Sequence, residues 1–205
     1  MPYPIGISEW YSPVAPGTGL HPRPSPAADL KRYFTDIDAS WSSIWYPSRK
    51  GEDLEEVHAR VNGVLELLVP EVEARFADKH KSILLVSHAA TTIALCRGLL
   101  ARPDISLRVG CCSVSEFARK PATSGVLGAW NATMLADGSP LKDGTTRGWS
   151  FDDIELADGK VCHPKYMLKS FLIEAGKVIH DVGVPNTEGT ENGPCGPQIQ
   201  LRSLL

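Results

Sequence analysis

The short apolar run Ser82–Ser87 (Ser-Ile-Leu-Leu-Val-Ser) constrains the fold of this chain more than any other feature. A continuous apolar run of this length is typical of a strand that is buried on both faces, as in a parallel sheet. The run leads through His88 into Ala89–Leu100, whose small and aliphatic residues predict a helix. Since a helix is also predicted before the run, the order helix, strand, sharp turn, helix indicates a layered α/β fold.

Two helices are predicted upstream, from apolar residues that recur every three or four positions. The first follows Ser25 and Pro26, which fit a helix cap and a first helical residue, and its stripe extends to Trp45. The second begins at Gly51-Glu52-Asp53, where acidic residues suit the helix dipole, and Pro70 is expected to kink or split it. The two stripes are Leu30, Tyr33, Phe34, Ile37, Trp41, Ile44 and Trp45, and Leu54, Val57, Val61, Val64, Leu65, Leu68 and Val72.

The second half of the chain predicts antiparallel strands at the edge of the sheet. Val109–Ala118 and Val126–Leu135 are rich in residues that favour strands, and Asp-Gly pairs mark turns after them. Residues 183–205 are poor in apolar side chains and predict a disordered tail. The expected organisation is one α/β domain over residues 1–182, followed by this tail.

Composition argues against several classes of function. The formal net charge of −3 disfavours direct binding to nucleic acid, because phosphate backbones attract basic surfaces. No apolar stretch approaches the about 18 residues of a membrane span, and no signal-peptide pattern is visible. Five irregularly spaced cysteines favour a reduced intracellular protein, in the nucleus or cytoplasm. Neither Cys111-Cys112 nor Cys162-His163 has zinc-site spacing, so no metal and no other cofactor is predicted.

His88 is the strongest candidate for chemistry because it stands between a predicted strand and a predicted helix. Ligands of open α/β sheets bind beyond the carboxyl ends of the strands. The free N–H groups of Ala89 and Ala90 would face the same point and favour an anion, phosphate above all. A histidine there can stabilise phosphoryl transfer or simply cap the helix, and its position alone does not decide between these roles. Ser87 is not predicted to be a hydrolase nucleophile, since the glycines of a nucleophile elbow are absent around it.

Two loop segments near the N-terminus add weaker candidates. Gly6–Tyr11 places one glutamate, Glu9, beside two aromatic residues. Glu9 could serve as a general acid if the fold brings it to a phosphate, although by itself it fits a solvated loop carboxylate. Arg23, in a His-Pro-Arg sequence, could bind phosphate through two N–H groups, but a plain surface loop is the favoured interpretation.

Three of these segments, taken in order, resemble the histidine-phosphatase (phosphoglycerate mutase-like) superfamily. Gly6–Trp10 is similar to its acid loop, Ile83–Ala89 to its second histidine motif, and Gly51–Arg60 to the helix between them. The resemblance covers about residues 5–135. It implies a three-layer α/β fold with a mostly parallel sheet and antiparallel edge strands, and hydrolysis of phosphate esters through a phosphohistidine.

The resemblance also implies roles for single residues. By motif, His88 corresponds to the second histidine, which together with two or more arginines holds the phosphoryl oxygens, and Glu9 corresponds to the proton donor. The backbone of Ala89 is expected to add an anion contact because of its place at the start of the predicted helix. No cofactor is implied, and the partner would be a phosphorylated small molecule or phosphoprotein. Gly110–Lys120 and the tryptophan-bearing segments after it resemble fungal members, including the phosphatase-like small subunit of transcription factor IIIC. That similarity would imply a nuclear protein assembly.

The chain departs from the family pattern in one respect: the Arg-His-Gly motif of the phosphate-accepting histidine occurs nowhere in it. The resemblance implies that this motif lies upstream of Glu9, with a strand that pairs with Ile83–Ser87. The sequence is therefore expected to be truncated and inactive as it stands, with a genuine short, non-catalytic interaction subunit as the alternative. An unpaired edge on Ile83–Ser87 predicts aggregation or self-pairing and a poorly stable monomer.

Overall fold

The computed structural model describes residues 5–14, 20–22, 24–25, 27–40, 43–76, 79–157, 160–162 and 196–197. The helices are α1 (Ala27–Leu30), α2 (Leu54–Phe76) and α3 (Ala89–Leu100), with two 3-10 turns, η1 (Ile5–Ile7) and η2 (Phe151–Asp153). The strands are β1 (Trp45–Tyr46), β2 (Val109–Cys111), β3 (Val114–Arg119), β4 (Trp130–Asp137), β5 (Thr146–Trp149), β6 (Glu155–Ala157), β7 (Lys160–Cys162) and β8 (Gly196–Pro197). Among these residues, every strand pairing is antiparallel: β1 with β8, β2 with β5, β3 with β4, and β6 with β7.

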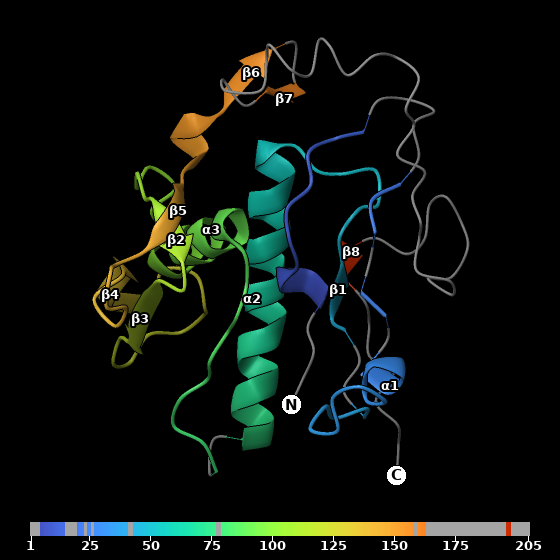
Figure 1. The fold of residues 1–205 in the computed structure, drawn as a ribbon. Helices are drawn as coiled ribbons and strands as arrows, with labels where there is room; N and C mark the ends of the chain where they lie inside the picture. The colour runs from blue at the N-terminus through green and yellow to red at the C-terminus, as the bar shows by residue number, and fades with distance from the viewer. Residues whose placement is uncertain are drawn as a thin grey trace.

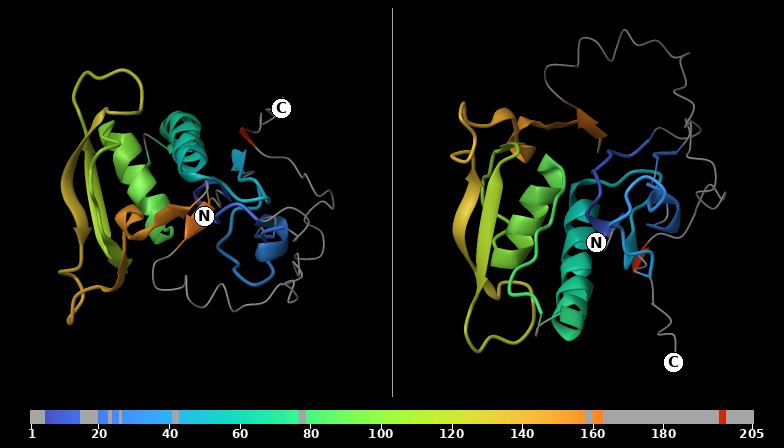
Figure 2. Two further views of the ribbon diagram at one scale, coloured as in Figure 1. Left: turned by 90° about the horizontal axis from the view of Figure 1, so that it is seen from above. Right: turned by 60° about the horizontal axis from the view of Figure 1, so that its bottom comes forward.

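The described elements form layers around two helices that lie side by side (Figure 1). Strands β3 and β4 cover the side of α3 that faces away from α2, while η1 and β1 lie on the other side of α2 (Figure 2). The apolar core fills the space between the layers. Its fully buried hydrophobic side chains are Val57, Val61, Val64, Leu65 and Leu68 from α2 and Ile93, Ala94 and Cys96 from α3. No helix among the described residues is long and apolar enough to cross a membrane.

Helix α2 confirms the predicted amphipathic helix and buries the predicted stripe. A reciprocal cap begins it: Asp53 Oδ1 accepts from the N–H of Glu56, and Glu56 Oε2 accepts from the N–H of Asp53, both at 2.8 Å. The split expected at Pro70 does not occur, because α2 continues to Phe76. Val72 and Phe76, beyond the proline, still pack on the core, and this packing offsets the one lost backbone hydrogen bond.

The prediction of a long helix after Ser25 is wrong. Only α1 forms there, and Trp45 at the end of the stripe lies in β1. Tyr33 and Phe34 are 79% and 64% exposed, so part of the expected apolar face has nothing to pack against. A helix of this length needs such packing, and periodicity alone does not supply it. Trp41, another member of the stripe, lies outside the described residues.

The antiparallel strands of the second half are confirmed, with different boundaries. The segment predicted as one strand from Val109 to Ala118 is divided, because Cys112 adopts a left-handed conformation (φ 60°) between β2 and β3. The two halves then pair with different partners, β5 and β4. Strand β4 begins at Trp130, after a turn in which Val126 is buried in the core.

The prediction that Ser82–Ser87 is a strand buried on both faces is wrong. The segment is not part of any sheet, and Leu84 and Val86 are 82% and 78% exposed. A strand needs a neighbour to bond its backbone, and no strand among the described residues lies against this one. For the same reason the mostly parallel sheet is not seen in the described part of the chain, and what is established is the α/β class. Of the predicted tail 183–205, only Gly196–Pro197 are described, as β8; the rest lies outside the described residues.

Candidate functional site

The loop Gly6–Tyr11 crosses the beginnings of α2 and α3, and polar side chains from both regions hold its backbone. The three donor–acceptor pairs are Arg60 Nη1 to Gly6 O (2.6 Å), Ser87 Oγ to Ile7 O (2.6 Å) and Thr91 Oγ1 to Ser8 O (2.8 Å). Three consecutive carbonyl oxygens are therefore satisfied by side chains that are far away in the sequence. This fixes a short 3-10 turn, η1, and the loop that follows it, whose carbonyl oxygens have no sheet or longer helix to bond them.

The next two residues of the loop are tied to the start of α2. Trp10 donates its indole N–H to the carbonyl oxygen of Glu52 (2.8 Å), and the N–H of Glu52 donates to the carbonyl oxygen of Tyr11 (2.9 Å). The indole ring also packs on Trp149 and Phe151, with ring centroids 6.1 and 5.6 Å away. The Trp10 side chain thus anchors the loop between the start of α2 and the segment formed by the end of β5 and η2.

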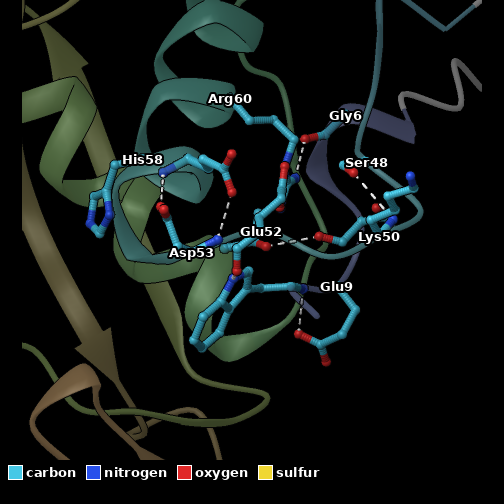
Figure 3. A network of polar contacts seen from close by, with 12 residues as sticks. Gly6, Glu9, Ser48, Lys50, Glu52, Asp53, His58 and Arg60 are labelled. Carbon is cyan, nitrogen blue, oxygen red and sulfur yellow. Dashed lines mark hydrogen bonds and ion pairs between the residues drawn. The ribbon is translucent and has the colours of Figure 1, made fainter. Parts of the chain in front are cut away.

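A buried ion pair joins α2 to the same loop. Arg60 Nε lies 2.7 and 2.9 Å from the two carboxylate oxygens of Glu52, and their side chains are only 2% and 7% exposed. Figure 3 shows Arg60 reaching between Glu52 and Gly6. Burial raises the pKa of the Glu52 carboxyl, and the bond to Arg60 opposes that effect. Because either charge alone would be costly in this environment, the pair and the loop it holds form one unit.

The fixed loop places Glu9 against His88. Glu9 Oε2 lies 2.9 Å from His88 Nδ1, and Glu9 Oε1 accepts a hydrogen bond from the N–H of Trp10 (2.9 Å). The two side chains stay open to solvent, since His88 is 56% and Glu9 35% exposed. His88 occupies the N-cap position of α3, but its side chain makes no capping hydrogen bond and contacts Glu9 instead. With Nδ1 directed to the carboxylate, the Nε2 atom of the ring is left for a ligand.

The first turn of α3 begins beside this pair. The first intrahelical bond runs from the N–H of Thr92 to the carbonyl oxygen of His88 (2.8 Å). The N–H groups of Ala89, Ala90 and Thr91 therefore have no acceptor within the helix. Free N–H groups at the positive end of a helix dipole are groups that favour anions.

A model of the histidine phosphatase superfamily (branch 1) matches residues 22–133, just over half of the chain. The chain belongs to the histidine phosphatase superfamily. The matched residues include α2, His88 and α3, whereas Glu9 lies before them. The association of Glu9 with His88 therefore rests on their 2.9 Å contact and not on the family match. No curated protein was found to be significantly similar to the chain.

Other polar residues of this histidine phosphatase member, from the His-Pro-Arg sequence and the cysteine pair, are not bonded to His88 among the described residues. His21 stacks on Tyr11 (4.6 Å between centroids) with Nε2 2.8 Å from the carbonyl oxygen of Ser12, so its ring holds the loop. Arg23 lies outside the described residues. Cys111 and Cys112 are free and exposed. In the part of the chain that the structure describes, no three His, Cys, Asp or Glu side chains are grouped so that they could hold a metal ion.

His58 on α2 is a further titratable group, and it serves packing. Its Nδ1 lies 2.7 Å from the carbonyl oxygen of Leu54, its Nε2 lies 3.2 Å from Arg97 Nη1, and its ring contacts Phe151. Burial lowers the pKa of His58; the bond to Leu54 opposes this effect and the charge of Arg97 adds to it. The ring is therefore held in its neutral form at neutral pH.

The sequence patterns did not predict that four residues of this superfamily member hold the loop Gly6–Tyr11 in place. These residues are Glu52, Arg60, Ser87 and Thr91. Arg60 left a signal in the sequence, because it is a charged residue on the apolar stripe of α2, between Val57 and Val61. A buried arginine needs a buried partner, and Glu52 lies two helical turns before it. The hydroxyl groups left no comparable signal, because serine and threonine are common at the starts of helices.

Proposed function

We propose that His88, Glu9 and the first N–H groups of α3 bind the phosphoryl group in a phosphatase that cleaves phosphate esters through a phosphohistidine. The observation that carries the proposal is the 2.9 Å contact between His88 Nδ1 and Glu9 Oε2, which lies at the N-terminus of a helix and is open to solvent. The backbone N–H of Ala89 adds an anion contact beside the ring. Membership of the histidine phosphatase superfamily supports the same chemistry.

In this proposal His88 and Glu9 have different tasks. His88, oriented by the carboxylate of Glu9, donates from Nε2 to a phosphoryl oxygen and stabilises the charge that builds up during transfer. Glu9 in its protonated form gives a proton to the leaving alkoxide as the phosphorus–oxygen bond breaks, and the carboxylate later takes a proton from the attacking water. The fold around this chemistry would place a parallel neighbour beside Ser82–Ser87, in a three-layer sheet.

The attacking histidine is not supplied by an Arg-His-Gly motif in these 205 residues. We therefore infer that the chain alone binds phosphate without turning over esters, and that the nucleophile comes from a segment outside this sequence. A phosphatase assay on a protein extended by an in-frame Arg-His-Gly segment tests this idea, with His88→Ala as the control. Equal turnover in that variant would remove His88 from the mechanism.

Binding can be tested on the chain as it stands. Titration with inorganic phosphate and orthovanadate, followed by calorimetry and by the NMR signals of the histidine rings, should show a site at His88. We expect His88→Ala to weaken phosphate binding by about tenfold or more, the effect of losing one charged hydrogen bond of at least about 1.4 kcal/mol. His80→Ala is the matched control, because His80 is an exposed histidine near the end of α2. The same loss in both variants would reject the site.

A second candidate is a non-catalytic role as an interaction subunit of a nuclear transcription-factor complex, of the fungal type noted above. The lack of an Arg-His-Gly motif favours it, since a subunit that only binds would not need the nucleophile. The two candidates differ in one measurement. If the extended protein binds phosphate normally but does not hydrolyse any ester, the binding role is favoured and the phosphatase proposal fails.

A further inference from the structure

The segment Ser82–Ser87 lies in no sheet, but the exposure of its last four residues alternates as in a strand. Leu84 and Val86 are 82% and 78% exposed, while Leu85 and Ser87 are half-buried and Leu85 packs on the core; Ile83, before them, is 50% exposed. This period of two is that of a strand with one face on the protein. In Figure 1 the segment is the green trace that runs beside α2 to the beginning of α3.

The backbone N–H and C=O groups of this segment also lack partners among the described residues. Among the described residues, no backbone hydrogen bond involves residues 82–87, and the first carbonyl oxygen to be bonded is that of His88, inside α3. Within the segment, only the hydroxyl of Ser87 is bound, to Ile7 O. The segment holds no proline, no charge and no bulge, which are the usual devices against edge-to-edge pairing. Its N–H and C=O groups are therefore available to another strand.

We propose that in the chain as it stands, without the parallel neighbour of the proposed phosphatase, the edge of Ser82–Ser87 is an interface with a second copy of this chain, paired antiparallel about a twofold axis at Leu85. Residues directly opposite in an antiparallel pair point to the same face, so both copies keep Leu85 and Ser87 on the core side when odd-numbered residues lie opposite odd-numbered residues, as they do about Leu85. Leu84 of each copy then lies opposite Val86 of the other. The two most exposed apolar side chains of the segment become cross-strand partners.

The charges at the two ends of the segment fit this arrangement. Lys79, His80 and Lys81 precede it and are exposed, while the carboxylate of Glu9 lies at its other end beside His88. Antiparallel pairing about Leu85 brings Lys81 of one copy next to the Glu9–His88 pair of the other, and the twofold axis repeats the contact. A parallel pair would instead set Lys81 against Lys81 and Glu9 against Glu9, which is unfavourable.

The first test is the oligomeric state of the whole chain. Sedimentation velocity and light scattering from nanomolar to submillimolar protein should show a discrete dimer that dissociates on dilution. Leu84→Lys/Val86→Lys should be monomeric over the same range, because both side chains are exposed and their replacement leaves the core intact. Tyr33→Lys/Phe34→Lys is the matched control, with similarly exposed side chains away from the segment, and should dimerise normally.

Several results would overturn the proposal. They are a chain that stays monomeric at every concentration, a double variant that still dimerises, and polydisperse aggregates with no discrete dimer. A chain that captures an added apolar β-strand peptide at this edge but does not pair with itself would assign the edge to another protein, which also overturns it. Amide hydrogen exchange supplies an independent measure, since residues 83–87 should gain protection only at concentrations at which the dimer forms.

The register and the charge contact can be tested separately. With Cys111, Cys112, Cys162 and Cys195 replaced by serine, a mixture of Leu84→Cys and Val86→Cys chains should oxidise mainly to the mixed disulfide, since these positions lie opposite each other. Predominant crosslinking of Leu84→Cys with itself would overturn the register. Lys81→Glu should weaken the dimer by about tenfold at low salt and less at high salt. No change at low salt would overturn the antiparallel charge contact.

Discussion

Two irregular segments meet at Ser87, and they are held in opposite ways. The loop Gly6–Tyr11 has carbonyl oxygens bonded by Arg60, Ser87 and Thr91, and Trp10 is anchored on α2. The segment Ser82–Val86 has no such contact, and its outer side chains face solvent. The comparison shows what fixes backbone outside regular structure. Polar donors from neighbouring helices can do so, whereas an apolar sequence cannot hold a strand without a neighbour.

Replacing the buried Arg60 should release the loop Gly6–Tyr11, and it should have the largest effect on stability of the substitutions considered. We expect Arg60→Met to lower the free energy of unfolding by about 3–5 kcal/mol, because it leaves the carboxylate of Glu52 buried and unpaired. Arg75→Met, which breaks the exposed pair with Glu71 on the same helix, should cost at most about 1 kcal/mol. Urea unfolding measures both. Similar losses in the two variants would show that the buried pair does not hold the loop, and Glu52→Gln/Arg60→Met should recover part of the loss.

A buried leucine on α2, which supports the held loop, and an exposed leucine in Ser82–Ser87 should respond differently to truncation. Leu65→Ala, at a side chain that is 1% exposed on α2, should cost about 2–5 kcal/mol through the cavity that it leaves. Leu84→Ala, at 82% exposure, should change stability by no more than about 0.5 kcal/mol when measured at low protein concentration. A larger effect at Leu84 in the monomer would mean that something covers the segment, contrary to the contrast drawn above.

The hydrogen bond from the Thr91 hydroxyl to Ser8 O joins the held loop to the candidate site on α3. Thr91→Val removes the bond to Ser8 O with little change of volume and should cost about 1 kcal/mol. It should also weaken phosphate binding, because the loop that carries Glu9 is less well placed. Thr92→Val on the next position of α3 is the control, and it should change neither quantity. Unchanged phosphate affinity in Thr91→Val would limit this contact to stability.

The smallest effect concerns pH and His58. The pKa of His58 lies below its usual 6.5 in the folded protein because of burial. As the pH falls, His58 of the unfolded chain therefore takes up a proton before His58 of the folded chain does. The contribution of His58 to the free energy of unfolding is complete above pH 6.5 and is lost as the pH falls through the folded pKa. His58→Gln should make the urea midpoint change less with pH between neutral and mildly acidic pH. His80→Gln, at an exposed position, should keep the slope of the parent, and an equal slope in all three proteins would contradict this account.

The sequence by itself determined the elements whose stability depends on local pattern. The stripe from Val57 to Leu68 predicted α2, and the small residues after His88 predicted α3. Segments rich in strand-forming residues, with Asp-Gly turns after them, predicted β3 and β4, since helices and hairpins are specified by neighbours along the chain. The sequence order of the motifs, through the family resemblance, also drew attention to Glu9 and His88. Their chemical roles remain predictions, while their 2.9 Å contact is a property of the structure.

Only the tertiary structure decided the rest. The fate of Ser82–Ser87 depended on whether a strand lies beside it, and an apolar run carries no information about its neighbour. The same holds for the helix expected at Tyr33 and Phe34, which had no surface to pack on. The contacts of Arg60, Ser87 and Thr91 with the loop join residues that are far apart in the chain. Side-chain hydrogen bonds of this kind form only once folding has brought their partners within about 3 Å, a distance that no sequence pattern encodes.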